Sequence, residues 1–293
     1  METMTVILDG KALAEKMQQN LANEVADWKN KGYRIPKLVV ILIGEDSASK
    51  VYVKNKEKSA QKIGFHSEVK RLDETVSEDE LLKIINEYNE DDSVDGILVQ
   101  LPLPKHIDEE KVLLAIDPKK DVDGFHPFNV GKLFVGDPDM HPCTPYGIIT
   151  LLKEHDINLS GKKVVIIGRS NIVGKPLMHM MLNEDATVTL AHSKTADLKQ
   201  ETLSADVLVA AIGQAEFITA DYVKEGAVVI DVGMNRNSEG KLVGDVDYQS
   251  VLDKVSAITP VPGGVGPMTI TMLMEQTMNQ GRKNRGEVTN DDK

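Results

Sequence analysis

The chain has 293 residues, of which 41% are hydrophobic and 27% charged, a composition typical of a globular protein and a length sufficient for two domains. Its formal net charge of −12 argues against a nucleic-acid binder with a broad basic surface. The single cysteine, Cys143, cannot form an internal disulfide, and we expect a packed, buried thiol. No signal-peptide pattern or membrane-spanning run is evident. We therefore expect a cytoplasmic protein that binds no nucleic acid, membrane or metal.

The first hundred residues alternate between helical and strand-like patterns. Apolar side chains recur every three or four positions from Asp9 to Gly32, which predicts a helix. The apolar run KLVVILI predicts a strand that is covered on both faces, and Ser47 or Ser49 can cap the helix that follows it. This β–α–β–α–β order predicts a parallel sheet. The predicted strands are 37–43, 65–72 and 96–101. The predicted helices run from Asp9 to near Gly32, from a point after Gly44 to Gly64, and from Ser77 to Tyr88.

A second α/β series begins at Lys163. The proline-rich stretch 121–145 shows little periodicity, and we place the junction between two domains there. The residues after Gly281 are polar, and we expect a frayed end. The fold class is therefore α/β, with an N-terminal domain built on a parallel sheet and a second, Rossmann-like domain. The predicted strands of the second series are 164–167, 187–191, 207–210, 228–232 and 257–259, and helices are predicted after Gly174, near 196–203 and at 268–278.

The ten residues 260–269 read PVPGGVGPMT and predict a rigid loop that ends on a helix. Pro267 suits the first position of that helix. No side chain at Gly263, Gly264 or Gly266 would block the approach of a ligand to the backbone. A structural turn between two elements is the alternative explanation of this composition.

Residues 163–176 read KVVIIGRSNIVGKP, an apolar strand that runs into Gly168, a turn and then a helix. In this context a glycine-containing loop offers backbone N–H groups and a helix N-terminus to a pyrophosphate. The spacing Gly168, Ser170, Gly174 departs from the G-x-G-x-x-G fingerprint, so a purely structural turn remains an alternative.

The end of the next strand favours NADP over NAD. An acidic residue there would accept the ribose hydroxyls of NAD, but the sequence continues with His192, Ser193 and Lys194. Arg169 lies in the preceding loop, and a guanidinium can bind a phosphate through two parallel hydrogen bonds. We therefore expect these cationic and hydroxyl groups to bind the 2′-phosphate of NADP.

Tyr52 and Lys56 are four residues apart and share one face of a predicted helix. Gln100 ends a buried strand, and Asp123 follows in a later loop, where both could reach the same edge of the sheet. A lysine beside an amide and a carboxylate can donate or accept a proton. The alternatives are a solvated lysine face, an edge hydrogen bond of Gln100 and a turn role for Asp123 before its glycine.

The spacing Y-x-x-x-K also occurs in short-chain dehydrogenases. In those enzymes the glycine-rich loop precedes the Y-x-x-x-K motif by more than a hundred residues. Here Tyr52 and Lys56 lie far upstream of Gly168, and this reversed order argues against that class.

Together these segments resemble the methylenetetrahydrofolate dehydrogenase/cyclohydrolase (FolD) family. The matching motifs occur in the family's order and cover the chain from about Asp9 to Gln280. They are YVKNKEKSAQKIG (52–64), DGILVQLPLP (95–104), KDVDGFHP (120–127), PCTPYG (142–147), GRSNIVGKP (168–176), AHSKT (191–195) and PVPGGVGPMT (260–269).

The resemblance implies two linked reactions in one-carbon metabolism, a pathway that supplies purine biosynthesis. Hydride passes from 5,10-methylenetetrahydrofolate to NADP, and water then opens the methenyl product to 10-formyltetrahydrofolate. Lys56 would be the main catalytic group of the hydrolysis, Tyr52 would pack on the folate, Gln100 would tune the lysine, and Asp123 would hydrogen-bond the pterin. The cofactor would bind Gly168, Arg169, Ser170, Ser193 and Met234, and the folate would also meet Pro262, Gly263 and Gly264.

The resemblance also implies a split first domain. Residues 1–143 and 267–293 would form the folate-binding catalytic domain and residues 144–266 the NADP-binding domain, with a cleft between them and a homodimer formed through the latter. At Met234 the family usually has isoleucine, which a backbone contact would tolerate. Two alternatives remain. A dehydrogenase acting on another substrate would leave Lys56 without a role, and a non-catalytic nucleotide-binding module would not need Gln100 or Asp123.

Overall fold

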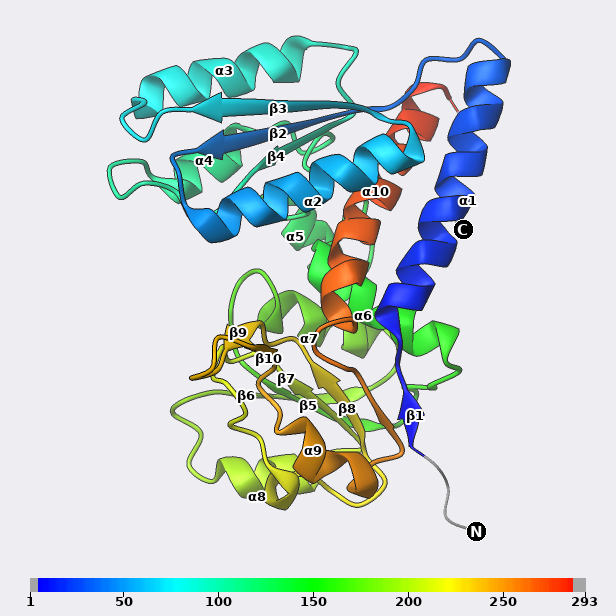
Figure 1. The fold of residues 1–293 in the computed structure, drawn as a ribbon, viewed down its shortest axis with the longest axis vertical. Coiled ribbons are helices and arrows are strands. Elements are labelled where there is room, and N and C mark those ends of the chain that lie inside the picture. Colours follow the sequence, from blue (N-terminus) through cyan, green and yellow to red (C-terminus); the bar gives the residue numbers. More distant parts are fainter. Residues whose placement is uncertain (1–4, 287–293) are drawn as a thin grey trace. The chain divides into compact units, whose positions relative to one another are not determined.

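The computed structural model describes residues 5–286 as two compact units (Figure 1). We call Glu15–Cys143 and the residues from Ile270 onward the three-stranded unit, and Thr144–Thr269 with the residues up to Ala14 the six-stranded unit. The residues before Glu15 belong to the six-stranded unit because β1 (Val6–Ile7) pairs with β11 (Ala257–Ile258). The chain passes from one unit to the other after Ala14, after Cys143 and after Thr269.

The three-stranded unit is built on a parallel sheet in the order β3-β2-β4. The central strand is almost completely buried because its two faces are covered by helices, with α3 on one face and α2 on the other (Figure 1). Val39 and Ile41 of this strand pack with Leu81 and Ile85 of α3 in one apolar cluster. The elements that lie wholly or mainly in this unit are α1 (Gly10–Asn30), β2 (Lys37–Ile43), α2 (Ser47–Ile63), β3 (His66–Leu72), α3 (Glu78–Glu90), β4 (Gly96–Val99), α4 (Glu109–Ala115), α5 (Pro127–Phe134) and α10 (Val265–Asn284). The first five residues of α1 and of α10 belong to the six-stranded unit.

The ends of α2 are fixed by local contacts. The side chain of Asp46 caps the helix by accepting a hydrogen bond from the backbone N–H of Ser49 at 2.7 Å. The expectation that Ser47 or Ser49 is the cap was therefore wrong by one to three residues. Gly64 ends the helix with φ +96°, a left-handed conformation that glycine adopts without a steric penalty. These two ends set the position of the helix that carries Tyr52 and Lys56.

The six-stranded unit has a parallel sheet in the order β1-β11-β8-β7-β5-β6. The strands after β1 form a doubly wound arrangement. From β5 the chain first adds β6 on one side of the sheet and then adds β7, β8 and β11 on the other side, as in dinucleotide-binding folds. The two-residue β1 is exposed and too short to show a periodic pattern, so the sequence did not predict it. The further elements are α6 (Cys143–Glu154), β5 (Lys163–Ile167), α7 (Gly174–Asn183), β6 (Thr187–Ala191), α8 (Leu198–Leu203), β7 (Val207–Ala210), η1 (Ala220–Tyr222), β8 (Val228–Asp231), β9 (Asn235–Arg236), β10 (Leu242–Val243), α9 (Tyr248–Val251) and η2 (Leu252–Lys254).

The last helix is longer than its sequence pattern predicts. It begins at Val265 rather than at Met268, with Pro267 still in its first turn, and it continues to Asn284. The expected fraying after Gly281 is therefore wrong as far as Asn284, because Arg282 donates to Glu24 at 2.8 Å and ties this end to α1. Residues 287–293 lie outside the described part of the chain. In the part described, no helix combines the length and apolarity that crossing a bilayer would need.

Candidate functional site

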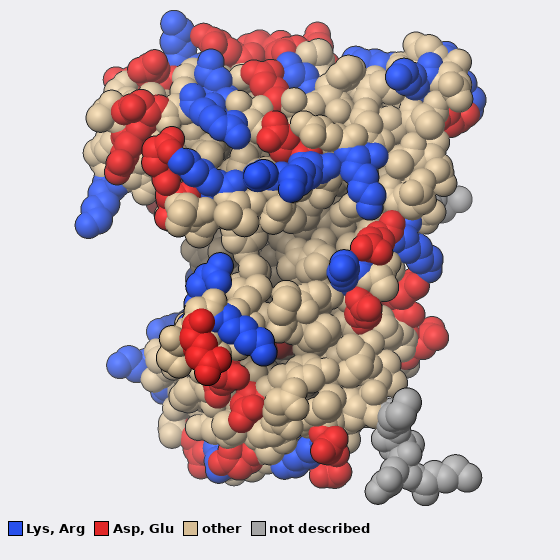
Figure 2. Space-filling view, viewed as in Figure 1, with Lys and Arg blue, Asp and Glu red and all other residues tan. Residues whose placement is uncertain are grey.

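Lys56 is the buried lysine of α2. Its side chain is 8% exposed, whereas Lys54 and Lys58 on the same helix are exposed, and Figure 2 shows a row of Lys and Arg side chains over α2. The Nζ atom of Lys56 donates a hydrogen bond to Oε1 of Gln100 at 3.0 Å. The lysine and the glutamine that the sequence singled out are therefore direct partners, and the solvated-face explanation holds for Lys54 and Lys58 only.

Gln100 is oriented by the strand that it follows. Its backbone N–H donates to the carbonyl of Ile41 at 2.9 Å, which continues the β2–β4 ladder by one residue. Its side-chain Nε2 donates to the carbonyl of Leu101 at 2.8 Å. Because Nε2 is bonded to Leu101, the Oε1 atom of Gln100 is the one that faces Lys56. The side-chain amide therefore accepts a hydrogen bond from the ammonium group of Lys56.

Asp123 lies in a turn that is held by another aspartate. Asp121 is buried, and its carboxylate accepts hydrogen bonds from the backbone N–H groups of Gly124 (3.2 Å) and His126 (2.8 Å) and from Nδ2 of Asn129 (2.9 Å). Gly124 has φ +74°, and a Cβ atom there would lie 2.3 Å from the backbone carbonyl of His141. The turn role that we considered for Asp123 thus belongs to Asp121, which leaves the Asp123 carboxylate available for other contacts.

Burial raises the pKa of three groups in this cluster, Asp123, Cys143 and Tyr52. Burial raises the pKa of the Asp123 carboxyl, and the neighbouring Lys56 ammonium opposes that rise. Burial also raises the pKa of the Cys143 thiol well above its ordinary value, so the thiol stays protonated at neutral pH. Burial likewise raises the pKa of Tyr52, which shares the helix face of Lys56. A partly desolvated carboxyl beside a lysine suits proton transfer and the binding of a polar ring.

The structure adds one supporting side chain that the sequence did not identify, Gln276, and it gives Cys143 a contact in the same cluster. Gln276 on α10 is 2% exposed and donates from Nε2 to the carbonyls of Val122 (2.7 Å) and His141 (2.9 Å). Its Oε1 accepts from the N–H of His141 at 2.6 Å, and the Cys143 thiol donates to Val122 at 3.3 Å. The expectation of a packed, buried Cys143 is confirmed. No local pattern identifies Gln276, which lies 154 residues from Val122.

In the six-stranded unit, Gly168 forms a sharp turn between β5 and α7. Its φ is +124°, and a Cβ atom would lie 2.2 Å from the carbonyl oxygen of Ala211. Gly174 is equally constrained, since a Cβ there would lie 2.0 Å from the carbonyl oxygen of Gly168. The Ser170 hydroxyl accepts from the N–H of Val173 at 3.1 Å. This geometry places a glycine turn against the start of a helix, which is the arrangement that binds a pyrophosphate.

The end of β6 carries no carboxylate. Ser193 and Lys194 are exposed, and the next acidic residue, Asp197, caps α8 by accepting from the N–H of Gln200 at 2.9 Å. Within residues 5–286, neither Arg169 nor Ser193 has a side-chain hydrogen bond or ion pair. These groups therefore fit a nucleotide that carries an extra phosphate, for which a guanidinium and a hydroxyl are suitable donors. Met234 follows β8 and is 48% exposed at the same edge of the sheet.

The glycines of the 260–269 loop have two different explanations. A Cβ on Gly264 would lie 2.6 Å from the carbonyl oxygen of Pro260, so close packing within the loop accounts for glycine there. The Gly264 carbonyl in turn accounts for Gly10, where a Cβ would lie 1.8 Å from that oxygen. Gly263 has φ +109°, a Cβ there would meet only Pro260 at 3.9 Å, and its carbonyl accepts from the N–H of Lys11 at 2.8 Å. The structural-turn explanation thus accounts for glycine at position 264, and Pro262, Gly263 and Gly264 stay predicted folate contacts.

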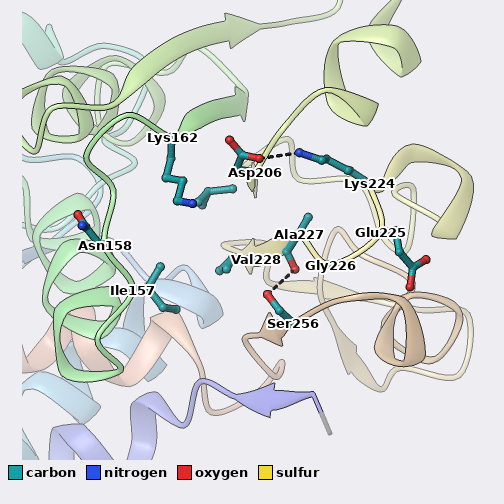
Figure 3. Close-up of a pocket in the computed structure, with 11 residues that line it drawn as sticks. Ile157, Asn158, Lys162, Asp206, Lys224, Glu225, Gly226, Ala227, Val228 and Ser256 are labelled. Atoms are coloured by element: carbon teal, nitrogen blue, oxygen red, sulfur yellow. Dashed lines mark hydrogen bonds and ion pairs between the residues drawn. The ribbon is translucent and has the colours of Figure 1, made fainter. Parts of the chain in front are cut away.

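A cavity of about 180 Å³ lies away from these residues (Figure 3). Its lining includes residues that immediately precede the strands β5, β7 and β11, namely Lys162, Asp206 and Ser256. It therefore lies at the amino edge of the sheet, whereas Gly168, Ser193 and Met234 follow the carboxyl ends of their strands. Asp206 pairs there with Lys224 at 2.6 Å. No sequence-predicted site residue lines this cavity.

The predicted residues therefore form two sets. Tyr52, Lys56, Gln100 and Asp123 belong to the three-stranded unit, where the lysine bonds the glutamine and interacts electrostatically with the aspartate. The second set belongs to the six-stranded unit and follows the carboxyl ends of β5, β6 and β8: Gly168, Arg169, Ser170, Ser193 and Met234.

Sequence models of one protein family match most of the chain. Residues 8–123 match the tetrahydrofolate dehydrogenase/cyclohydrolase catalytic domain, and residues 142–285 match the NAD(P)-binding domain of the same family. A protein of Streptococcus thermophilus described as "Bifunctional protein FolD" is 61% identical over 274 residues, which is 94% of this chain and 96% of that protein.

Solved structures agree with this match. A bifunctional FolD methylenetetrahydrofolate dehydrogenase/cyclohydrolase from Campylobacter jejuni is similar with a TM-score of 0.94 and 51% identity, over 96% of this chain and 99% of that one. A Trypanosoma brucei methylenetetrahydrofolate dehydrogenase-cyclohydrolase, complexed with NADP cofactor and inhibitor, is similar with a TM-score of 0.91 and 37% identity, over 95% and 98% of the two chains.

Proposed function

The chain belongs to the tetrahydrofolate dehydrogenase/cyclohydrolase family, and from this premise we propose how its side chains divide two reactions. The enzyme oxidises 5,10-methylenetetrahydrofolate to the methenyl form with NADP and then hydrolyses that product to 10-formyltetrahydrofolate. The cofactor supplies a hydride acceptor when it is bound. The assignments that follow rest on the geometry of the described residues.

The oxidation needs positioning more than it needs acid–base chemistry. The nitrogen lone pair next to the methylene carbon stabilises the cation that hydride loss leaves behind, so no general base is required. Tyr52, half-buried beside Lys56 on α2, provides a ring on which the folate can stack. Asp123 provides a carboxyl group for hydrogen bonds to the pterin, and its raised pKa makes the protonated, donating form more accessible.

The hydrolysis needs proton transfer, because the attacking water loses protons and a ring nitrogen gains one. Lys56 is the group that we assign to this step, and its 3.0 Å hydrogen bond with Gln100 is the observation that carries the assignment. The amide oxygen of Gln100 holds the ammonium in one orientation without neutralising its charge. Gln100 therefore directs the proton donor, and the carboxyl group of Asp123 contributes to the field around it.

We assign cofactor binding to the carboxyl edge of the six-stranded sheet. Gly168 and Ser170 form the turn for the pyrophosphate, and Arg169 and Ser193 bind the 2′-phosphate. We assign Met234 to a further contact with the cofactor, and Pro262, Gly263 and Gly264 to contacts with the folate. Residues 1–143 with 267–293 would be the folate-binding part and 144–266 the NADP-binding part. We further propose a cytoplasmic homodimer whose product serves purine biosynthesis.

The experiment compares both activities in a Gln100→Met variant. NADPH formation is followed with methylenetetrahydrofolate as substrate, and hydrolysis is followed with the methenyl compound supplied directly. Methionine removes the amide at similar volume, so we expect hydrolysis to slow by about 10- to 100-fold and oxidation to slow less. Gln61→Met is the matched control because Gln61 is an exposed glutamine of α2. Equal rates of hydrolysis in the Gln100 variant and the wild type would refute the assignment.

A further inference from the structure

Asp245 is a completely buried carboxylate in the six-stranded unit that holds the loop after β7. It accepts hydrogen bonds from three consecutive backbone N–H groups, those of Ile212 (2.7 Å), Gly213 (3.1 Å) and Gln214 (2.9 Å). A fourth donor, Nδ2 of Asn235, lies 2.8 Å away. Three successive N–H groups donate to one carboxylate. Each of these hydrogen bonds restrains the orientation of one peptide group, so together they fix the backbone of this loop.

Asp231 holds Asp245 in turn. Its carboxylate, at the end of β8, accepts from the N–H groups of Asp245, Val246 and Gly233, each at 2.9 Å. The approach is so close that a Cβ atom on Gly244 would lie 1.8 Å from Oδ2 of Asp231. The two carboxylates therefore form a chain of contacts that runs from β8, through the peptide of Asp245, to the loop after β7.

No lysine or arginine among residues 5–286 forms an ion pair with either aspartate. A buried carboxylate without a counter-cation has a large desolvation cost, which hydrogen bonds offset only in part. Apolar side chains would stabilise this unit at lower cost. The two aspartates are therefore better explained by a role in positioning the backbone than by a contribution to the free energy of unfolding.

The loop that Asp245 holds is in contact with the predicted pyrophosphate turn. Ala211 is the residue before the three bound N–H groups. Its carbonyl oxygen is so close to Gly168 that a Cβ atom on Gly168 would lie only 2.2 Å from it. A shift of this loop by a few tenths of an ångström would therefore reach Gly168. Asp231 also bonds the N–H of Gly233, next to Met234. Both loops that flank the proposed cofactor edge depend on the same two carboxylates.

We propose that Asp245, held by Asp231, is a positioning residue for NADP: it fixes the loop after β7 against the glycine turn and so shapes the cofactor site. The inference rests on the proposed placement of NADP at the carboxyl edge of the six-stranded sheet. Asp245 acts through the backbone and is not a catalytic residue. Loss of this carboxylate slows the oxidation, which uses NADP. It leaves the hydrolysis unchanged, because that reaction does not use NADP.

The test is Asp245→Asn, which keeps the shape of the side chain but turns an NH₂ group toward backbone N–H donors. We expect the Kd for NADPH, measured by fluorescence titration, and the KM for NADP to rise by about 10- to 100-fold. Hydrolysis of directly supplied methenyltetrahydrofolate should keep its wild-type kcat and KM. A merely structural role would lower both activities together.

Asp206→Asn is the matched control. Asp206 is in the same unit and also accepts a backbone hydrogen bond, from Lys163 at 2.9 Å, but it lies at the opposite edge of the sheet beside the cavity of Figure 3. We expect it to leave NADPH affinity unchanged. If Asp245→Asn does not fold, Asn235→Ala removes one of the four donors and should raise the Kd less, in the same direction.

The outcomes separate the inference from the placement on which it rests. Wild-type NADPH affinity in the folded Asp245→Asn variant, or in Asn235→Ala when the former does not fold, overturns the inference. An equal loss of affinity in Asp206→Asn overturns it as well, because the effect would then be general destabilisation. If Arg169→Ala weakens NADPH binding while the Asp245 and Asn235 variants do not, only the inference fails. If Arg169→Ala also binds normally, the placement of the cofactor fails.

Discussion

Replacing Lys56 by methionine should separate the two activities of this enzyme. Methionine has nearly the length of lysine and suits a side chain that is 8% exposed, so α2 should keep its packing. The change leaves Oε1 of Gln100 without its 3.0 Å donor. An unsatisfied buried acceptor costs about 1–3 kcal/mol, and removing a buried charge offsets part of that cost. We therefore expect the free energy of unfolding to change by about 1 kcal/mol, and the variant to fold.

The catalytic effect should be much larger and confined to one step. Removing a general acid or base typically slows a reaction by about 10² to 10⁴, which corresponds to about 3–5 kcal/mol in the activation barrier. This loss applies to hydrolysis, where protons move. Hydride transfer depends on orientation and on the substrate nitrogen, so NADPH should still form and the methenyl intermediate should accumulate, visible by its near-ultraviolet absorbance.

The same variant makes a second, electrostatic change. The Lys56 ammonium opposes the rise in the pKa of Asp123, so its removal should raise that pKa further. The KM for the folate should then depend on pH over a range shifted upward from that of the wild type. Lys58→Met, an exposed lysine two residues along the same helix, is the control for charge. Hydrolysis at near wild-type rate in Lys56→Met would refute the catalytic role of this lysine.

Two further predictions concern the six-stranded unit. Arg169→Ala should raise the KM for NADP by about 10- to 100-fold through the loss of a charged hydrogen bond to the 2′-phosphate, and the KM for NAD far less; equal changes with both cofactors would contradict the assignment. Burial raises the pKa of Asp231 from 3.8 to about 6, so the folded chain keeps this proton at pH values where the unfolded chain has lost it. The contribution of Asp231 to the unfolding free energy should therefore decrease by about 3 kcal/mol as the pH rises from below 4 to above 6. The difference between the wild type and Asp231→Asn in urea unfolding measures this decrease, and a constant difference across that range would disprove it.

The sequence by itself determined the order of the main elements and pointed to the candidate site residues. The strands 37–43 and 207–210 have the predicted bounds because short β-branched, apolar runs between turn residues indicate buried strands without reference to the rest of the chain. The edge strand 187–191, which is mostly half-buried, also has its predicted bounds. Tyr52 and Lys56 were placed on one helix face by their spacing of four. The absence of an acidic residue directly after β6 could also be read from the sequence, because it depends only on a few consecutive residues.

Only the tertiary structure decided which side chains hold these residues in place. Gln276 lies 154 residues after Val122, and Asp245 lies 33 residues after Ile212, so no local spacing relates them. The pattern also could not separate Gly264, where a Cβ would lie 2.6 Å from the carbonyl oxygen of Pro260, from Gly263, where a Cβ would meet only Pro260 at 3.9 Å. A hydrogen-bond partner or a close backbone contact depends on which distant segments the fold brings together. Periodicity and turn composition report only on neighbours in the chain, and the supporting contacts of this enzyme are made between segments far apart in it.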